Sequence, residues 1–441
     1  METWRSMSAA DLGREIEARR IDPVELATFF LDTIEAHELG PRIYARLTRD
    51  RAMAEAEAAR ARAESGQRVS PLDGVPISWK DLFDSDGTET EAGSHLLEGR
   101  VPDADAVVLR NATAMGLVCL GKTHMSELAF SGLGYNPSTA TPPNVNYPRC
   151  VPGGSSSGAA ASVAFGLAPA AIGSDTGGSV RVPSAWNDLV GLKTTHDRLS
   201  LEGVVPLCLR FDTVGPLCRT VEDAGLLLGV LEGRRAPDLN SVSLKGVRLG
   251  VLTSVAMQDL RQEVEEAFQE SVVELLKGGA EVELFEVPEV DEALAFGGTL
   301  YTAEAYGLWK DVIEATPDKM YGEILERFRL GAKVSGPDYV ANWARLRAIR
   351  AIYDAKTAKY DAVIIPTTPI LPPDLSRLNT DEDYYKTENL MALRNTRIGN
   401  LMGLCGLTLP TGEPSVGIQF MCAPGQEERL LRLGMAAEEV L

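Results

Sequence analysis

Hydrophobic and polar positions along the chain form short blocks that predict strands and longer blocks that predict helices. Short apolar runs between turn signals are typical of buried strands, whereas apolar residues at helical spacing predict amphipathic helices. We expect strands at residues 75–80, 117–120, 189–193, 247–253, 280–287, 361–366, 407–410 and 417–422, and helices at residues 8–20, 22–37, 49–65, 104–115, 220–231, 262–277 and 427–441.

Strands alternate with helices over the whole length, which predicts an α/β protein. We expect one mixed, mostly parallel central sheet that helices cover on both faces. No internal repeat and no linker interrupts the pattern, so we expect a single domain over residues 1–441. Its N-terminal part, residues 1–68, is predicted to be a helical wrap, and residues 289–360 an inserted helical lobe.

Charge and composition exclude several classes of protein. The formal net charge of −20 argues against a nucleic-acid partner, because phosphate backbones select basic surfaces. Hydrophobic residues make up 44% and charged residues 24%, which is typical of a globular protein. No run approaches the ~18 apolar residues of a membrane span. Residues 1–20 contain no apolar signal segment, so we expect a cytoplasmic protein without a membrane partner.

Cysteines and histidines give no sign of a metal centre. The six cysteines contain no C-x-x-C spacing, and most adjoin apolar residues, which predicts reduced thiols in the core. Only four histidines occur, and none follows His196. Because zinc sites built on H-E-x-x-H need two histidines on one helix, we expect no metal site.

Two loops rich in glycine and serine, at residues 152–158 and 174–181, flank one apolar block at 159–172. Glycine lets the backbone approach a ligand closely, and consecutive free N–H groups can hold negative charge. Two turns around a helix and a strand would explain the same residues. If the loops are functional, acyl transfer is the first chemistry to consider. The candidate nucleophiles are Ser155, Ser156, Ser157 and Ser179.

Residues 116–123 match the phosphate-loop pattern G-x-x-x-x-G-K-[ST], but their context excludes it. A phosphate loop follows a strand and is open, whereas here Leu117 to Leu120 are themselves the expected strand. We expect Lys122 and Thr123 simply to begin the next turn.

Residues 154–158 also match the G-x-S-x-G nucleophile elbow, with Ser156 at the centre. That motif requires a preceding strand and a late catalytic histidine. The segment before it is rich in proline and asparagine, and no histidine lies beyond His196. A Ser-His-Asp hydrolase is therefore not expected.

Without histidine, a nucleophilic serine needs another base. A lysine can serve when burial lowers its pKa, because desolvation disfavours the ammonium form. Lys80 ends the expected strand 75–80 beside Trp79, and strand ends in α/β sheets face ligand crevices. An ordinary lysine whose amine reaches solvent fits the same position, so the pattern leaves both interpretations open.

Three segments together resemble the amidase signature family. They are GVPISWKD at 74–81, GGSSSG at 153–158 and GSDTGGSVRVP at 173–183. Further similarity extends through residues 191–194, 213–217, 220–224, 403–410 and 417–420, so that it covers nearly the whole chain. Two departures are mild: Ser157 stands where glycine is commoner, and Ala159 where serine is commoner.

The resemblance implies a role for each matched residue. Ser179 would be the nucleophile, and Ser155, on a cis peptide bond, would connect it to the base Lys80. Asp175 and Arg181 are expected to hold the loop. The oxyanion hole would consist of the backbone N–H groups of Thr176, Gly177, Gly178 and Ser179.

The resemblance also implies the reaction: hydrolysis of the C–N bond of a small carboxylic amide through a serine acyl-enzyme, with ammonia or an amine released and no cofactor. Residues 69–232 would form the catalytic core, with the lobe 289–360 over the pocket. Arg394 or Arg397 could bind a substrate carboxylate, or both could be helix-surface arginines. The segment Gly132, Leu133 and Gly134 is expected to shape the pocket.

The family includes several kinds of protein. Stand-alone amidases and carboxybiuret or allophanate hydrolases are similar, and a homodimer is compatible with either. The alternatives are the glutaminase A subunit of a tRNA-dependent amidotransferase and a partner-dependent, non-catalytic homologue. The C-terminal motif resembles stand-alone small-amide hydrolases more closely.

Overall fold

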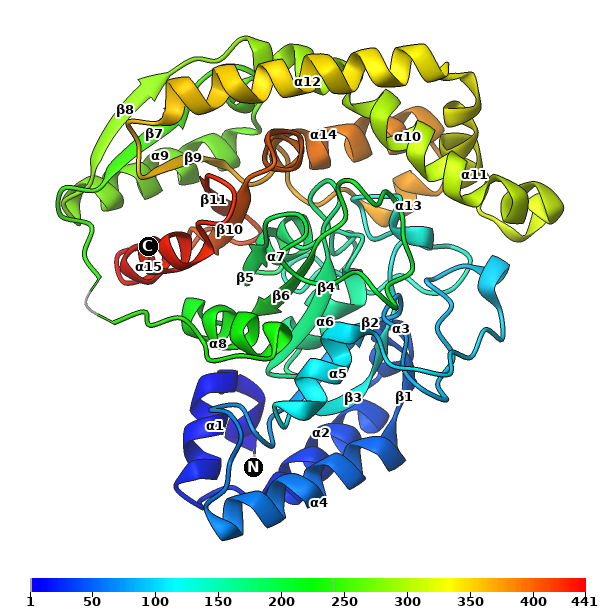
Figure 1. Cartoon of the computed structure of the whole chain (residues 1–441), viewed down its shortest axis with the longest axis vertical. Coiled ribbons are helices and arrows are strands. Elements are labelled where there is room, and N and C mark those ends of the chain that lie inside the picture. The colour runs from blue at the N-terminus through cyan, green and yellow to red at the C-terminus, as the bar shows by residue number, and fades with distance from the viewer. Residues whose placement is uncertain (1, 241) are drawn as a thin grey trace.

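The computed structural model describes residues 2–240 and 242–441. Within these ranges, eleven strands form one sheet in the order β1-β3-β2-β4-β6-β5-β10-β11-β9-β7-β8. In Figure 1 it runs from β8 at the upper left to β1 and β3 near the bottom. The strands are β1 Tyr44–Leu47, β2 Pro76–Lys80, β3 Val118–Thr123, β4 Ala170–Ser174, β5 Val190–Lys193, β6 Val214–Cys218, β7 Arg248–Leu252, β8 Glu281–Phe285, β9 Ala362–Pro366, β10 Cys405–Pro410 and β11 Gly417–Cys422.

Fifteen α-helices surround this sheet in the described part of the chain. They are α1 Ala9–Glu17, α2 Pro23–Ala36, α3 Gly40–Ile43, α4 Arg49–Ser65, α5 Val107–Ala114, α6 Ser157–Ala164, α7 Arg181–Trp186, α8 Val221–Glu232, α9 Gln262–Lys277, α10 Glu289–Ala315, α11 Gly322–Arg329, α12 Gly336–Thr357, α13 Leu375–Leu378, α14 Glu382–Met402 and α15 Glu427–Glu438. None is long and apolar enough to cross a membrane within residues 2–240 and 242–441.

Polar caps fix where several of these helices begin, and these helices begin within one residue of the predicted starts. The Ser8 hydroxyl accepts from the backbone N–H of Asp11 at the start of α1, and the Asp22 carboxylate caps α2 ahead of Pro23. The Thr220 hydroxyl caps α8 in the same way. Each cap satisfies N–H groups that have no partner within the helix.

The α/β class and the mixed sheet are confirmed, but the balance of strand directions differs from the expectation. Four pairings are parallel, and the other six pairings among the described strands are antiparallel. The sheet is therefore not mostly parallel. The connection between β10 and β11 spans only residues 411–416, and a link this short joins antiparallel neighbours.

The predicted secondary structure is wrong at four places. Strands β1, β4 and β6 form where no strand was assigned, and Lys122 and Thr123 belong to β3 rather than to a turn. Lys122 pairs in register with Trp79 of β2, and its side chain is fully buried. The sequence prediction ended this strand before the charged residue Lys122. In the structure, hydrogen bonding to β1 and β2 continues β3 through Lys122.

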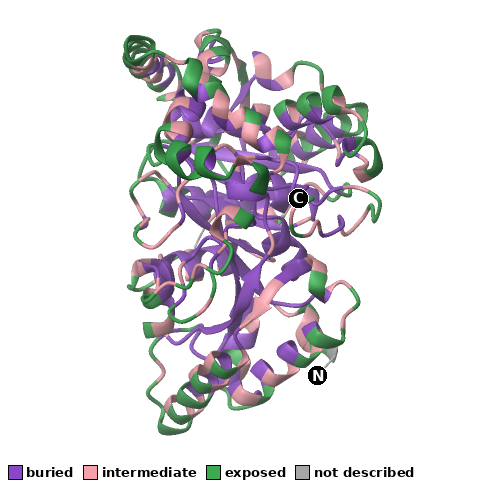
Figure 2. Cartoon of the chain, turned by 90° about the vertical axis from the view of Figure 1, so that its right-hand side faces the viewer, coloured by how far each residue is buried: buried purple, intermediate pink, exposed green. Residues whose placement is uncertain are grey.

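Helices cover both faces of the sheet, as the contacts of two neighbouring residues of β10 show. Leu407 packs against Gly434 of α15, whereas Thr408 faces the opposite side, next to Ser184 of α7. Successive side chains of a strand point to opposite faces, so α15 and α7 cover opposite sides. Figure 2 shows the strands buried in the interior and the exposed residues on the outer helices and loops.

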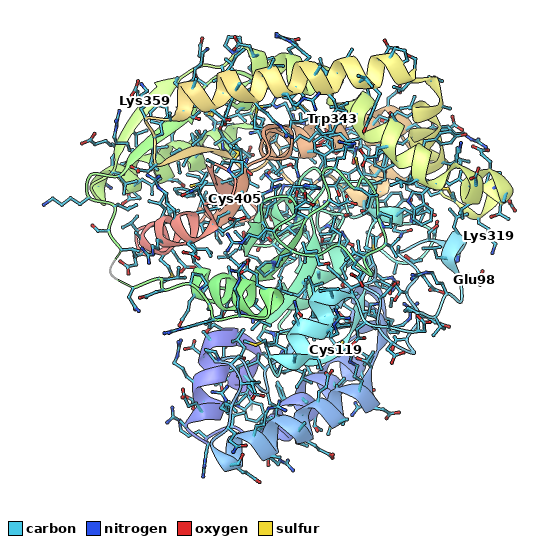
Figure 3. All side chains as sticks on the ribbon, viewed as in Figure 1. Glu98, Cys119, Lys319, Trp343, Lys359 and Cys405 are labelled. Atoms are coloured by element: carbon cyan, nitrogen blue, oxygen red, sulfur yellow. The ribbon has the colours of Figure 1, made fainter. Side chains whose placement is uncertain are left out.

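The two ends of the molecule carry different helical groups. Helices α1, α2 and α4 lie at the bottom of Figure 1, near β1 and β3, while α10, α11 and α12 lie at the top. Lys319, between α10 and α11, lies 3.6 Å from Glu98 and so connects the upper group to the loop before α5 (Figure 3).

All six cysteines are free thiols, in agreement with the expectation of reduced cysteines. Five are buried, including Cys119 on β3 and Cys405 on β10, and only Cys150 is partly exposed. Figure 3 shows Cys119 and Cys405 in separate parts of the fold.

Candidate active site

Lys80 ends strand β2 in the interior of the protein. Its side chain is fully buried, and its Nζ lies 2.6 Å from Ser155 Oγ and 2.8 Å from Ser174 Oγ. Burial lowers the pKa of Lys80 to about 7, although Asp175 and Asp212 act in the opposite direction. No carboxylate forms an ion pair with this amine in the described part of the chain. A large fraction of Lys80 is therefore neutral near pH 7.

The loop that carries Ser155 is held by the segment 132–134. The N–H of Gly153 donates to the carbonyl of Leu133 at 3.1 Å, and that of Gly154 donates to the carbonyl of Gly132 at 2.8 Å. Gly153 has a φ of +82°, and the peptide bond between Gly154 and Ser155 is cis. Ser155 is fully buried with its hydroxyl against Lys80.

Ser179 lies at the far end of the second serine loop, directly before α7. The loop is organised by Asp175, whose carboxylate forms an ion pair with Arg181 at 2.9 Å, both side chains being fully buried. Burial alone would raise the pKa of Asp175, but the charge and hydrogen bonds of Arg181 outweigh it and hold that pKa at about 2. Asp175 and Arg181 therefore hold the loop, as expected.

Backbone N–H groups in this loop fall into two sets. The N–H of Gly178 donates to Asp175 Oδ1 at 2.9 Å, so it is already occupied. The N–H groups of Thr176, Gly177 and Ser179 have no protein acceptor among the described residues. Gly178 also has a φ of +138°, and a β-carbon there would lie 2.1 Å from Thr396 Oγ1, so no other residue fits.

A pocket of about 580 Å³ opens above this loop. Its walls come from the loop itself, from α14 and from the α10–α11 region, so that part of the segment 298–330 lines the same pocket as Ser179. The lining residues are Ala129, Phe130, Ser131, Thr176, Gly177, Ser179, Leu207, Gly298, Tyr301, Thr302, Glu323, Glu326, Arg327, Leu330, Lys386, Asn389, Leu390, Leu393 and Arg397.

The structure brings some of the predicted site residues together and separates others. Lys80 and Ser155 are in contact, but no hydrogen bond joins the hydroxyls of Ser155 and Ser179 in the part of the chain that is described. The two loops meet instead through the backbone, where the N–H of Ser156 donates to the carbonyl of Ser179 at 3.3 Å. Thr176, Gly177 and Ser179 line the pocket, and Gly178 does not.

The two candidate arginines lie on one helix, α14, in different surroundings. Arg397 lines the pocket. Arg394 donates instead to the carbonyl of Gln258 at 2.6 Å and to Asn395 Oδ1 at 3.2 Å, outside the pocket lining. Gly132, Leu133 and Gly134 also lie outside the lining, and the carbonyls of Gly132 and Leu133 instead accept hydrogen bonds from the Ser155 loop.

Several residues of the site were missed from the sequence. Ser174 is the second hydroxyl beside Lys80, and Asp212 accepts from the Thr176 hydroxyl at 2.6 Å. Burial raises the pKa of Asp212 to about 6. Tyr301 comes from α10, far along the chain. Ser174 could have been identified, since it lies within a recognised motif, but Asp212 and Tyr301 lie in no motif that the sequence offers.

Residues that could hold a metal do not gather anywhere in residues 2–240 and 242–441: no three His, Cys, Asp or Glu side chains are placed as ligands.

Comparison with known proteins extends over nearly the whole chain. The family model described as Amidase matches residues 25–431. The chain is 36% identical to a 2-amino-5-chloromuconic acid deaminase of Comamonas testosteroni over 451 residues, 99% of this chain and 97% of that protein. It is 32% identical to the A subunit of the glutamyl-tRNA(Gln) amidotransferase of Pseudomonas savastanoi pv. phaseolicola, with 98% and 97% covered.

Solved structures agree with this relationship. A crystal structure of an amidase superposes with a TM-score of 0.89 at 29% identity, covering 99% of this chain and 100% of the other. A peptide amidase in complex with the competitive inhibitor chymostatin superposes with a TM-score of 0.81 at 26% identity, covering 98% and 97%. The chain therefore belongs to the amidase signature family and is a hydrolase of amide C–N bonds.

Proposed function

We propose that this protein hydrolyses small carboxylic amides through an acyl-enzyme on Ser179, with Ser155 and Lys80 as the proton path. The observation that carries the proposal is the buried amine of Lys80, 2.6 Å from Ser155 Oγ and without a carboxylate partner among the described residues. A neutral amine has one lone pair and two N–H bonds. It can therefore accept a proton from Ser155 while it donates to Ser174.

The first half of the reaction forms the acyl-enzyme. Ser155 gives its proton to Lys80 and takes one from Ser179, whose oxygen attacks the amide carbonyl. The negative charge on the carbonyl oxygen is held by the N–H groups of Thr176, Gly177 and Ser179, each worth roughly 3–4 kcal/mol. We leave Gly178 out of this set, because its N–H is bonded to Asp175.

The second half returns the protons. Lys80 protonates the leaving nitrogen through Ser155 as the C–N bond breaks, so that ammonia or an amine departs. Water then loses a proton to the same path and attacks the acyl group, which releases the carboxylic acid and restores Ser179. The path in this structure lacks a hydrogen bond between Ser155 and Ser179, and such bonds often form only when substrate is bound.

Labelling with a fluorophosphonate tests the nucleophile directly. The isolated wild-type chain should be modified once, on Ser179, as located by peptide mass spectrometry. Ser179→Ala should abolish the label and lower kcat for amides by at least about 10⁴-fold. Ser156→Ala is the matched control and should leave labelling intact, because among the described residues that buried hydroxyl donates only to the Ser174 carbonyl. Label on another residue, or normal turnover by Ser179→Ala, would contradict the proposal.

A second candidate is the glutaminase subunit of an amidotransferase, which several relatives at 30–33% identity are named as. In that case, or for a non-catalytic homologue, the isolated chain would hydrolyse no simple amide by itself. The other relative is named a deaminase, a reaction that likewise releases ammonia. Turnover and Ser179 labelling by the purified chain alone would contradict both alternatives.

A further inference from the structure

Arg397 is a cation in the pocket that no described residue pairs with. Its side chain is partly buried on α14 and lines the pocket, yet its guanidinium makes no hydrogen bond or ion pair with any described residue. Burial lowers its pKa below the ordinary value, and Tyr301 acts in the opposite direction. A buried charge without a counter-ion is costly, so this position favours a ligand that supplies one.

Tyr301 offers a second unused polar group in the same pocket. Its side chain is buried, and its hydroxyl has no hydrogen-bond partner in the described part of the chain. Burial raises the pKa of the phenol, Arg397 is the foremost charge that opposes this shift, and both side chains line the same pocket. The phenol therefore remains a donor at neutral pH, on a side chain that lines the same pocket as Arg397.

Other charged residues of the pocket are already engaged. Arg327 donates to the Phe130 carbonyl and stacks on two aromatic rings. Lys386 lies 3.6 Å from Glu323, and Glu326 lies 3.2 Å from Arg329. Most of the remaining wall is apolar, so Arg397 with Tyr301 is the pair left to bind an anion.

The anion would lie close to the reacting carbonyl. The Arg397 side chain lies over Gly177, where an added β-carbon would be 3.5 Å from Cγ and 4.0 Å from Nε. The Thr396 hydroxyl donates to the Gly177 carbonyl at 2.7 Å, and this bond holds α14 against the loop at the residue before Arg397. Gly177 is one of the proposed oxyanion donors, so a short linker spans from the carbonyl to the guanidinium.

We propose that the substrate is an acidic amide: its acyl part carries a carboxylate one or two carbons from the scissile carbonyl, bound by Arg397 and Tyr301. This assignment rests on the proposed function of Ser179. It makes Arg397 a specificity-determining residue that touches substrate, and it predicts a dicarboxylic acid and ammonia as products.

A panel of paired amides tests the assignment. Malonamate and succinamate are compared with malonamide and succinamide, their neutral counterparts of the same shape. Wild type should prefer each acid by at least about 10²-fold in kcat/KM, because a charged, bidentate contact is lost in the diamide. Arg397→Met should lower kcat/KM for the acids at least about 10²-fold more than for the diamides, so that the preference is lost, and Tyr301→Phe should lower the acid rate about tenfold.

Two variants on the same helices serve as controls. Arg394→Met removes an arginine one turn earlier on α14 that lies outside the pocket, and Tyr306→Phe removes a phenol of α10 that faces Glu314. Both should keep the wild-type preference. Equal rates for acid and diamide in wild type, or an equal loss for both in Arg397→Met, would overturn the assignment. N-acetylglycine carries its carboxylate on the leaving amine. If Arg397→Met lowered the rate only for amides of that kind, the assignment would be overturned as well.

Binding separates this inference from the proposed function. Ser179→Ala should bind malonate or succinate in calorimetry, and the added Arg397→Met substitution should weaken that binding by at least about 10²-fold. If wild type is labelled on Ser179 but neither dicarboxylate binds and no acid is preferred, the substrate assignment fails while the hydrolase mechanism stands. If Ser179 is not labelled, the proposed function itself fails.

Discussion

Two fully buried lysines on neighbouring strands have opposite surroundings. Lys122 of β3 lies 3.5 Å from Asp81 Oδ1 and donates to Thr90 Oγ1 at 2.7 Å. The amine of Lys80 on β2 hydrogen-bonds, among the described residues, only to the hydroxyls of Ser155 and Ser174. Burial lowers the pKa of both amines, but at Lys122 the adjacent carboxylate counters that effect directly. Burial alone therefore does not make a lysine a base, and the groups placed around the amine decide it.

The largest expected difference between the two lysines is in turnover. Lys80→Met should lower kcat by roughly 10²–10⁴-fold, because the variant keeps the side-chain volume and removes the proton acceptor. The measurement is ammonia release at pH 8, with thermal unfolding to show that the variant folds. A variant that retains normal turnover would leave Lys80 as a buried structural lysine like its neighbour.

Giving Lys80 a carboxylate should make it resemble Lys122. Wild-type kcat/KM should fall about tenfold per pH unit below about 7, because Lys80 binds a proton there and loses its lone pair. Ser174→Asp puts a carboxylate beside the amine, raises its pKa and should move this acidic limb upward by at least about one unit. Activity at pH 7 then falls at least about fivefold, as the neutral fraction of Lys80 decreases. Ser174→Asn, of the same size without the charge, should keep the limb near its wild-type position; identical profiles for both variants would contradict lysine as the base.

Removing the paired lysine should have the smallest effect on turnover and a clear effect on stability. Lys122→Met leaves the buried Asp81 with Arg46 as its remaining close partner, at 2.6 Å. The free energy of unfolding in urea should fall by about 3 kcal/mol. The value of kcat per folded molecule should change by less than about threefold, since Lys122 bonds neither serine loop. A large loss of kcat with unchanged stability would show that the two lysines do not differ as described.

Local sequence rules predicted most strands and helix starts, because caps and apolar runs act within a few residues. These rules were insufficient where pairing between strands decides whether a segment becomes a strand. The segments of β1 and β6 have no distinctive hydrophobic pattern. Strand β3 continues through Lys122 because two neighbouring strands bond to it. The balance of parallel and antiparallel pairings also depends on which strands become neighbours.

Local sequence rules were also insufficient to predict which residues line the pocket. Arg394 and Arg397 are alike in the sequence, and α14 itself was not predicted. Only the rotation of that helix in the fold directs Arg397 to the pocket and Arg394 to the Gln258 carbonyl. Residues 132–134 were expected to shape the pocket, but they lie outside its lining, and two of their carbonyls hold the loop of Ser155.

The sequence by itself determined the chemical parts of this protein: serines, glycines and one strand-end lysine in motifs typical of amide hydrolysis, with no histidine late enough to replace the lysine. Those identities depend on covalent chemistry and local backbone freedom. The tertiary structure alone decided that Lys80 is buried beside two hydroxyls, that Gly178 donates to Asp175, and that Arg397 and Tyr301 share a pocket. Burial, charge pairing and contact between distant segments arise only when the chain has packed, and these are the quantities that set a pKa and select a substrate.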